Sequence, residues 1–340
     1  MDLTPQQLDG LLGAWALDAL EPDEQEAVDA ALAVHPEVAG EAPGLRALVA
    51  LMGEAVASPA PPELRTAVLR SAAASAPVAL VATDPVTLMA NQIRAFDQLM
   101  GTLGPDDWSR RAEPYDWTVH GLLAHLLVIE QYTAHQLGLA SVEWPPEPRG
   151  HLAMGAGIIA AEQQRSPTET LQAWHETARS TLDAFQAGQG PVLDSMVELH
   201  GWPVRVEGLL VARSFETWTH GDDIRRATGR PLSAPSPADL RAMSQFSVST
   251  LPLILSFDRD KASLGPTRVV LTGDGGGTYD LGAPGDQPSE GQEPLLMVLD
   301  VVDYCHWAAR RVNVEDLGLV VQGDRVTADR LLRAAQLLAV

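Results

Sequence analysis

Residues 215–223 read FETWTHGDD and lie inside a longer pattern that predicts a helix over about 204–228. Apolar residues recur there every three or four positions, which is the spacing of one helical face. The recurring apolar residues are Val206, Leu209, Leu210, Ile224 and Ala227. Glu216 and His220 fall roughly on the same face. A carboxylate on a buried face is costly unless it is paired or bound to a metal, so the segment predicts a partner for both residues.

Four long helical patterns predict a bundle in the middle of the chain. They cover about 85–103, 118–138, 167–187 and 204–228. The third opens with SPTE, where Ser166 can cap the helix and Glu169 completes a capping box. Gly229 stands where a helix commonly ends in a left-handed residue. Helical bundles build metal sites from side chains on facing helices, so the partner is expected on a neighbouring helix.

The best candidate partner lies in WTVHGLLAHLLVIEQ, which begins at residue 117. His125 shares a face with Leu122 and Ile129, whereas His120 in the first turn is expected to face outward. Two histidines and a glutamate can form a three-ligand zinc site with an open fourth position. Asp223, one turn after the second histidine, can hold that histidine from behind.

Two structural interpretations stay open beside the metal site. A lone inward histidine is often a hydrogen-bonded core residue, and a Glu/His pair at i,i+4 is usually a surface contact. Their coincidence on apolar faces favours a metal, because buried charge needs compensation. Zinc is not the only ion that fits, since His and Glu ligands also suit nickel or iron.

The regions on either side of the bundle differ from it in pattern. Residues 4–56 read as short amphipathic helices, followed by the linker SPAPPE at 58–63 and an alanine-rich stretch. After the bundle come a helix at about 238–256, the strand-like RVVLTG and TYDLG, a helix at 294–311, the alternating LGLVVQG and a closing helix. The motif GDGGG predicts a hairpin turn, since no Lys-Ser/Thr or helix follows it.

These patterns predict a mainly α protein with three domains. They are a helical N-terminal domain at 1–76, a four-helix bundle at 84–230 and a small α+β domain at 237–340. The formal net charge of −22 disfavours direct binding to nucleic acid. Neither a membrane span nor a secretion signal is recognisable, so a soluble cytoplasmic protein is expected. Cys305 is the only cysteine, which excludes an internal disulfide, and we expect it to be buried and unreactive.

The segments WTVHGLLAHL and FETWTHGDDIRRATGRP resemble the DinB-like bundle of mycothiol-dependent maleylpyruvate isomerases and related actinobacterial proteins. This resemblance implies that His125, Glu216 and His220 bind zinc. The segments DYCHWAARRVN and LVVQGDRVTADRLLRAA resemble the small sterol-carrier-like domain of the same family. The resemblance covers roughly residues 84–340.

The resemblance implies a zinc-dependent enzyme that uses mycothiol or a similar thiol on a small electrophile. A thiol at the open metal position would be deprotonated and could add to a double bond. Expulsion of the thiol gives isomerisation, and its retention gives S-transfer. The family places an arginine of the C-terminal domain near the site, so Arg310 and Arg311 are candidates for substrate binding, with Arg213 as a third. A structural role stays the alternative for each arginine.

Residues 11–41, LLGAWALDALEPDEQEAVDAALAVHPEVAGE, resemble the N-terminal domain of zinc-associated anti-sigma factors. The three zinc-ligand positions of that pattern are here Ala31, His35 and Val38, so this domain cannot hold zinc in that way. The resemblance nevertheless implies an alternative function, that of a cytosolic anti-sigma-type transcriptional regulator. In it, residues 1–76 would bind a basic sigma factor and the bundle would sense metal or thiol. A helical appendage for packing or oligomerisation is the other interpretation.

Overall fold

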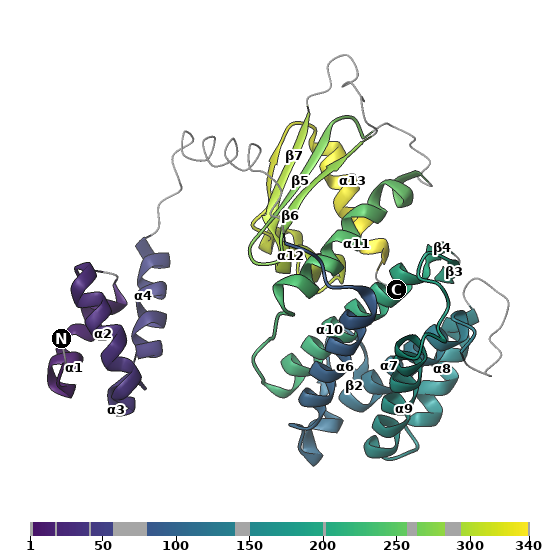
Figure 1. Ribbon diagram of the computed structural model, residues 1–340, viewed down its shortest axis with the longest axis horizontal. Helices are drawn as coiled ribbons and strands as arrows, with labels where there is room; N and C mark the ends of the chain where they lie inside the picture. The colour runs from purple at the N-terminus through teal and green to yellow at the C-terminus, as the bar shows by residue number, and fades with distance from the viewer. Residues whose placement is uncertain are drawn as a thin grey trace. The chain divides into compact units, whose positions relative to one another are not determined.

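The computed structural model describes residues 3–17, 19–40, 42–56, 80–139, 150–199, 202–256, 264–282 and 294–338. The chain divides into two compact units, Met1–Val68 and Leu69–Val340, and Figure 1 labels most of their helices and strands. The fold is mainly helical, as predicted. The predicted linker SPAPPE and the stretch after it lie outside the described residues. None of the helices in the described ranges combines the length and apolar character needed to cross a membrane.

The first unit consists of short helices around a small apolar core. They are α1 (Pro5–Ala16), α2 (Pro22–Val34), α3 (Pro36–Ala39) and α4 (Ala42–Val56). Thr4 and Gln7 cap α1 reciprocally in a capping box. Ala31 is buried in the core and Val38 packs against it. Two of the three positions that hold ligands in zinc-associated anti-sigma domains are thus part of the apolar packing here.

The second unit contains the predicted bundle, with its four long helices in place. They are α6 (Pro85–Met100), α7 (Val119–Gln136), α9 (Pro167–Gln186) and α10 (Val206–Thr228). Thr118 caps α7, Ser166 and Glu169 form the expected capping box on α9, and Gly229 ends α10 with a φ of 68°. Helix α10 packs along α6 and α7, and α9 packs along α7.

The bundle also contains elements that the sequence did not predict. Helix α8 (Gly150–Glu162) is rich in alanine and glycine and shows no clear apolar stripe. Two short antiparallel hairpins stand between the helices. They pair β1 (Arg111–Ala112) with β2 (Trp117–Thr118), and β3 (Met196–Leu199) with β4 (Trp202–Arg205). Strands of two to four residues are too short to produce a readable alternation.

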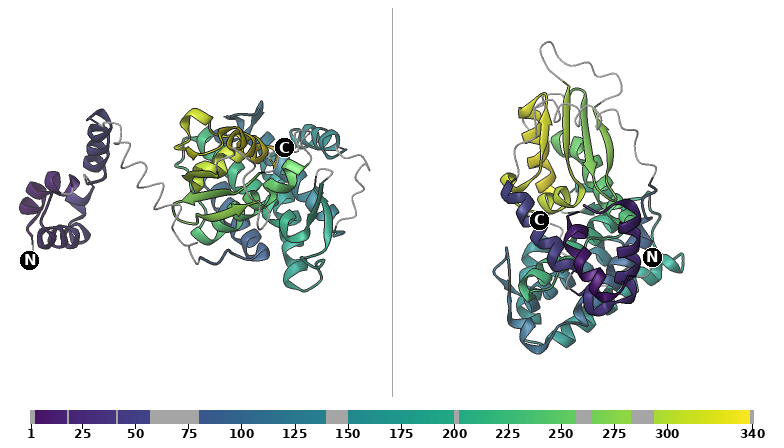
Figure 2. Two further views of the ribbon diagram at one scale, coloured as in Figure 1. Left: turned by 90° about the horizontal axis from the view of Figure 1, so that it is seen from above. Right: turned by 90° about the vertical axis from the view of Figure 1, so that its left-hand side faces the viewer.

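The C-terminal part is a four-stranded sheet with helices against one face, as Figure 2 shows. Its elements are α11 (Pro237–Ser256), β5 (Thr267–Thr272), β6 (Gly277–Leu281), β7 (Leu295–Asp300), α12 (Val301–Ala308), β8 (Val320–Gln322) and α13 (Arg325–Ala335). The strand order is β6-β5-β7-β8, with only β5 and β7 parallel. Apolar side chains of α11, α12 and α13 share one core with β5 and β7.

The predicted helix at 294–311 is wrong in its first half. Residues 295–300 form the strand β7 in the middle of the sheet, and the helix begins only at Val301, capped by Asp300. A strand buried between two neighbours is a continuous apolar run, which periodicity alone does not distinguish from a helix. The prediction for GDGGG is confirmed: it forms the turn between β5 and β6, where Gly273 and Gly275 have φ values of 84° and 88°.

The bundle core predicts a large effect of one truncation. Trp174 of α9 is fully buried, and its ring lies 4.6 Å from that of Phe96 on α6. We expect Trp174→Ala to lower the free energy of unfolding by about 3–5 kcal/mol, because it leaves a large cavity between the helices. Urea denaturation followed by circular dichroism measures this. Val192→Ala at an exposed site is the control and should change it by less than about 0.5 kcal/mol. A loss below about 1 kcal/mol for Trp174→Ala would contradict the packing described here.

Candidate metal centre

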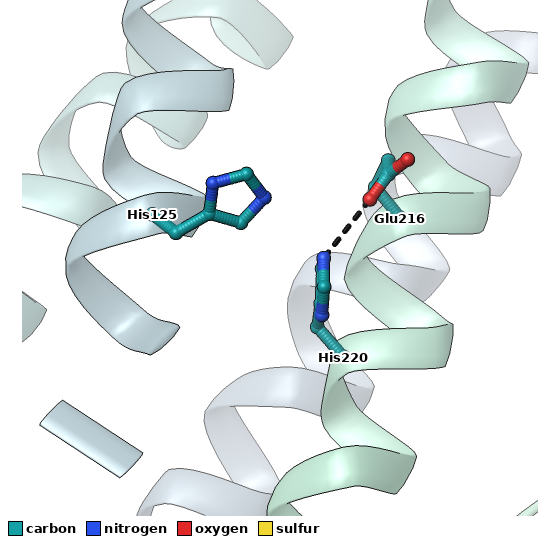
Figure 3. Close-up of side chains that lie close together, drawn as sticks. All are labelled: His125, Glu216 and His220. Carbon is teal, nitrogen blue, oxygen red and sulfur yellow. Dashed lines mark ion pairs between the residues drawn. The ribbon is translucent and has the colours of Figure 1, made fainter. Parts of the chain in front are cut away.

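His125 projects from α7 toward Glu216 and His220 on α10, as Figure 3 shows. The three side chains each offer one ligand atom, and these atoms all lie within 4.8 Å of one another. Nε2 of His220 is 3.0 Å from Oε2 of Glu216. The two imidazole rings are nearly perpendicular, with centroids 5.0 Å apart. The structure thus brings together the three residues that the helical periodicity singled out.

An aromatic pair from the β1–β2 hairpin covers this triad. The ring of Trp117 stacks on that of His125 with centroids 5.0 Å apart, and the ring of Tyr115 lies 5.6 Å from that of His220. Tyr115 and Trp117 also stack on each other. Sequence reasoning missed both residues. Trp117 carried a weak signal, because it directly precedes the cap of α7, but nothing in the pattern pointed to Tyr115.

Behind the triad, the buried carboxylate of Asp223 holds His220 in place. Oδ2 of Asp223 lies 3.0 Å from Nδ1 of His220, so an N–H on Nδ1 can donate to it. Arg311 donates to the same carboxylate from Nη2 at 2.7 Å and from Nε at 3.1 Å. With Nδ1 bonded to Asp223, Nε2 of His220 is left to face Glu216. Asp223 therefore lies where the sequence placed it, behind the second histidine.

The charges around the triad favour an ionised Glu216. Burial alone would raise the pKa of Glu216, but the hydrogen bond and charge of His220, helped by His125 and Arg311, hold that pKa below its usual value. Burial would likewise raise the pKa of Asp223, and the hydrogen bonds from His220 and Arg311 lower it. Burial would lower the pKa of His220, and its bonds to Asp223 and Glu216 raise it instead. Two ionised carboxylates thus lie on either side of the His220 ring, and Arg311 offsets part of their charge.

The donor set fits a divalent metal ion. Two imidazole nitrogens and one carboxylate oxygen are a common ligand set for zinc, and a fourth position would stay open for water or thiol. A carboxylate bonded to the other nitrogen of a ligating histidine, as Asp223 is here, orients its ring and increases its basicity. Within the described ranges, this is the one group of three or more His, Cys, Asp or Glu side chains with suitable spacing.

A pocket that is partly open to solvent adjoins the triad. Glu216 and Tyr115 line it, and most of its other walls are apolar. The apolar walls come from α7, α10, α11 and the end of α12, and include Ile129, Leu209, Met243, Phe246 and Ala308. A small organic molecule in this pocket would therefore lie beside Glu216, one of the three triad residues.

The three arginines expected near the substrate lie in different surroundings. Arg311 and Arg213 line the pocket, whereas Arg310 is exposed and donates to the carbonyl oxygen of Gln336. Arg213 is buried and contacts the carboxylate of Glu130. Glu130 was missed, although it interrupts the apolar face of α7 just as Glu216 interrupts that of α10.

Two further side chains of interest lie outside the triad. His120 is half-buried, with Nε2 2.9 Å from the hydroxyl of Thr170 on α9, so it does not face outward as expected. Cys305 is buried, and burial raises the pKa of its thiol. This agrees with the prediction of an unreactive cysteine.

Residues 89–225 match the family model described as the mycothiol maleylpyruvate isomerase N-terminal domain. Uncharacterized proteins from two strains of Mycobacterium tuberculosis are each 25% identical over 251 residues, or 72% of this chain and 91% of theirs. The crystal structure of the mycothiol-dependent maleylpyruvate isomerase is 14% identical, with a TM-score of 0.47 over 70% of this chain and 91% of that one. The crystal structure of a histidine-to-alanine mutant of that enzyme is 12% identical, with a TM-score of 0.46 over 69% of this chain and 91% of that one. The family match contains all three triad residues and ends before Arg311.

The geometry predicts that metal binding depends on His125 but not on His120. Both histidines lie on α7, but only His125 reaches the triad. We expect about one divalent ion per chain in the wild type and in His120→Ala, and a loss of stoichiometric metal in His125→Ala and His220→Ala. Inductively coupled plasma mass spectrometry of the purified proteins measures this. Equal metal content in all four proteins would exclude the triad as the metal site.

The position of Asp223 predicts a graded effect on affinity. We expect Asp223→Asn to weaken metal binding by about 10–100-fold, because the histidine loses a charged acceptor on its second nitrogen. Competition with a chromophoric chelator measures the dissociation constant. Asp239→Asn is the control, since Asp239 is also a buried carboxylate but bonds Asn91 and Gln92 away from the triad. If both variants weaken metal binding equally, the effect of Asp223 is only one of general stability.

Proposed function

We propose that the chain, whose residues 89–225 match the family model of the mycothiol maleylpyruvate isomerase N-terminal domain, is a metal- and thiol-dependent enzyme. It would use mycothiol or a similar low-molecular-weight thiol to isomerise a small electrophile or to transfer the thiol to it. The convergence of His125, Glu216 and His220 beside a pocket is the observation that carries this proposal. Zinc is the metal that we propose for the site, because the ligands and the open position suit it.

A divalent ion in this site would lower the pKa of a thiol bound at its open position, so that thiolate is present at neutral pH. The protein itself supplies the surroundings. Asp223 fixes the ring of His220, and the apolar walls limit the access of water. Burial raises the pKa of Tyr115, whose ring lies 5.3 Å from the guanidinium carbon of Arg311. Tyr115 therefore keeps its proton, and both groups can donate hydrogen bonds to a substrate oxygen.

The proposed reaction balances without an oxidant or a reductant. The thiolate sulfur forms a bond to one carbon of a double bond conjugated with a carbonyl group, and the π electron pair moves to the carbonyl oxygen. Tyr115 and Arg311 are placed to stabilise that oxygen. Rotation about the resulting single bond, followed by expulsion of the thiolate, gives the isomer. Protonation of the neighbouring carbon instead retains the thiol and completes an S-transfer.

The anti-sigma alternative gains no support from the family match or from the relatives. A sigma-factor partner for residues 1–76, an oligomeric state and a cytoplasmic location stay predictions. In the described part of the first unit, Ala31 and Val38 belong to the apolar packing. This agrees with the expectation that these positions do not hold zinc in the way of that pattern.

The proposed function predicts a thiol-dependent reaction that requires Glu216. We expect zinc-loaded wild-type protein to consume mycothiol with an α,β-unsaturated carbonyl compound, or to isomerise a cis-configured one. Glu216→Gln should lower the rate at pH 7 by at least about 30-fold, because a free thiol with a pKa near 8.5 is only about 3% thiolate there. Substrate absorbance and thiol titration measure the two outcomes.

His120→Ala is the matched control and should keep the wild-type rate, since this residue lies outside the triad. The proposal would be overturned if zinc-loaded wild type never exceeded the uncatalysed thiol reaction. Activity that survives in Glu216→Gln would instead place the chemistry away from the triad.

A further inference from the structure

A buried ion pair forms part of the pocket wall. Arg213 of α10 contacts the carboxylate of Glu130 on α7, and both side chains are almost completely shielded from solvent. Arg213 lines the pocket, whereas Glu130 is not among the lining residues. The contact is made by Nη2 of Arg213. Within the described ranges, its Nε and Nη1 atoms have no hydrogen-bond partner. One arginine of the pocket is thus already paired with a carboxylate of the protein.

The pair changes what Arg213 can offer to a ligand. A carboxylate that enters a low-dielectric pocket must recover the cost of leaving water, which needs an uncompensated cation or several hydrogen bonds. Burial raises the pKa of Glu130, and the Arg213 guanidinium opposes that rise. A ligand carboxylate next to Arg213 would therefore compete with the carboxylate of Glu130, and the two negative charges would repel each other.

The other pocket arginine is also engaged. Arg311 gives both its Nε and its Nη2 to Asp223, and Asp223 in turn holds His220. Turning Arg311 fully toward a ligand carboxylate would remove part of the support of the triad. Arg310 faces the carbonyl oxygen of Gln336 and is not among the lining residues. Each arginine that lines the pocket thus contacts a buried carboxylate, Arg213 that of Glu130 and Arg311 that of Asp223, which Arg226 also contacts.

We propose that the pocket selects an uncharged electrophile that carries an apolar group, such as an aryl- or branched-alkyl-substituted α,β-unsaturated ketone, rather than a dicarboxylate. This inference rests on the proposed function, whose substrate class it names. The carbonyl oxygen lies toward Tyr115 and Arg311, and the apolar group lies against Leu209, Met243 and Phe246. Burial of such a group against apolar walls is favourable and needs no cation.

The test compares the binding of two unreactive ligands of equal size in the absence of thiol. The neutral ligand is 5-phenylpentan-2-one and the anionic one is 4-phenylbutanoate, each titrated into zinc-loaded protein by calorimetry. Because a carboxylate can also bind zinc, the informative quantity is the change in the affinity ratio between variants. Glu130→Gln leaves Arg213 uncompensated, so it should improve the relative affinity for 4-phenylbutanoate about tenfold or more.

The double variant Glu130→Gln/Arg213→Met is the matched control. It removes both charges, is expected to fold even if Glu130→Gln alone does not, and should keep the wild-type affinity for both ligands. A tenfold loss of 4-phenylbutanoate binding in the double variant, with the ketone unaffected, would overturn the proposal, because Arg213 would then be a carboxylate anchor. An unchanged ratio in a folded Glu130→Gln variant would overturn it as well.

Binding and turnover separate this inference from the proposed function. If the proposed function fails, the zinc-loaded protein consumes no thiol with any electrophile, whatever the ligand preference. If only this inference fails, thiol is consumed but an unsaturated dicarboxylate is the better substrate by kcat/KM. We expect the kcat/KM of the neutral aryl ketone to exceed that of the dicarboxylate by about tenfold or more.

Discussion

The buried carboxylate of Asp223 is the interaction on which the rest of the site depends. It accepts from His220, from Arg226 one turn further along α10, and from Arg311 after α12. A fully buried carboxylate is tolerated only when such donors satisfy it. In satisfying it, the chain fixes the ring of a triad histidine and brings the C-terminal α+β part against the bundle. Folding and site assembly are therefore not separable here.

A second contact, next to Asp223, also links the C-terminal α+β part to the bundle. The neighbouring Asp222 lies 3.2 Å from Nε2 of His306 on α12, and the ring of His306 stacks on that of Trp218. Consecutive acidic residues on α10 thus hold two side chains from the C-terminal part. The family match over 89–225 contains the triad but not the whole pocket, because α11, the end of α12 and Arg311 form part of the pocket wall.

The sequence predicted the parts of the site that follow from helical periodicity. Glu216, His220 and His125 were recognisable because charged or polar side chains interrupted apolar faces. Tyr115 was not, since it lies in a hairpin whose strands have two residues each. The strand β7 was mistaken for a helix because it is apolar on both faces, and only its pairing with β5 and β8 determines its form. Periodicity reports local structure, whereas these two features depend on contacts that are distant in sequence.

Glu130 and Glu216 show what can and cannot be inferred from a carboxylate on an apolar helical face. Both interrupt an apolar helical face, and burial disfavours the charge of both. Glu130 is about 1% exposed and is compensated by a permanently charged arginine, whereas Glu216 is 23% exposed, lines the pocket and faces two histidines. Histidines can release their protons and bind a cation in place of them, which an arginine does not do at neutral pH. The cost of burial therefore identifies both carboxylates, but the chemistry of the compensating group and its access to the pocket decide which of them can serve a ligand.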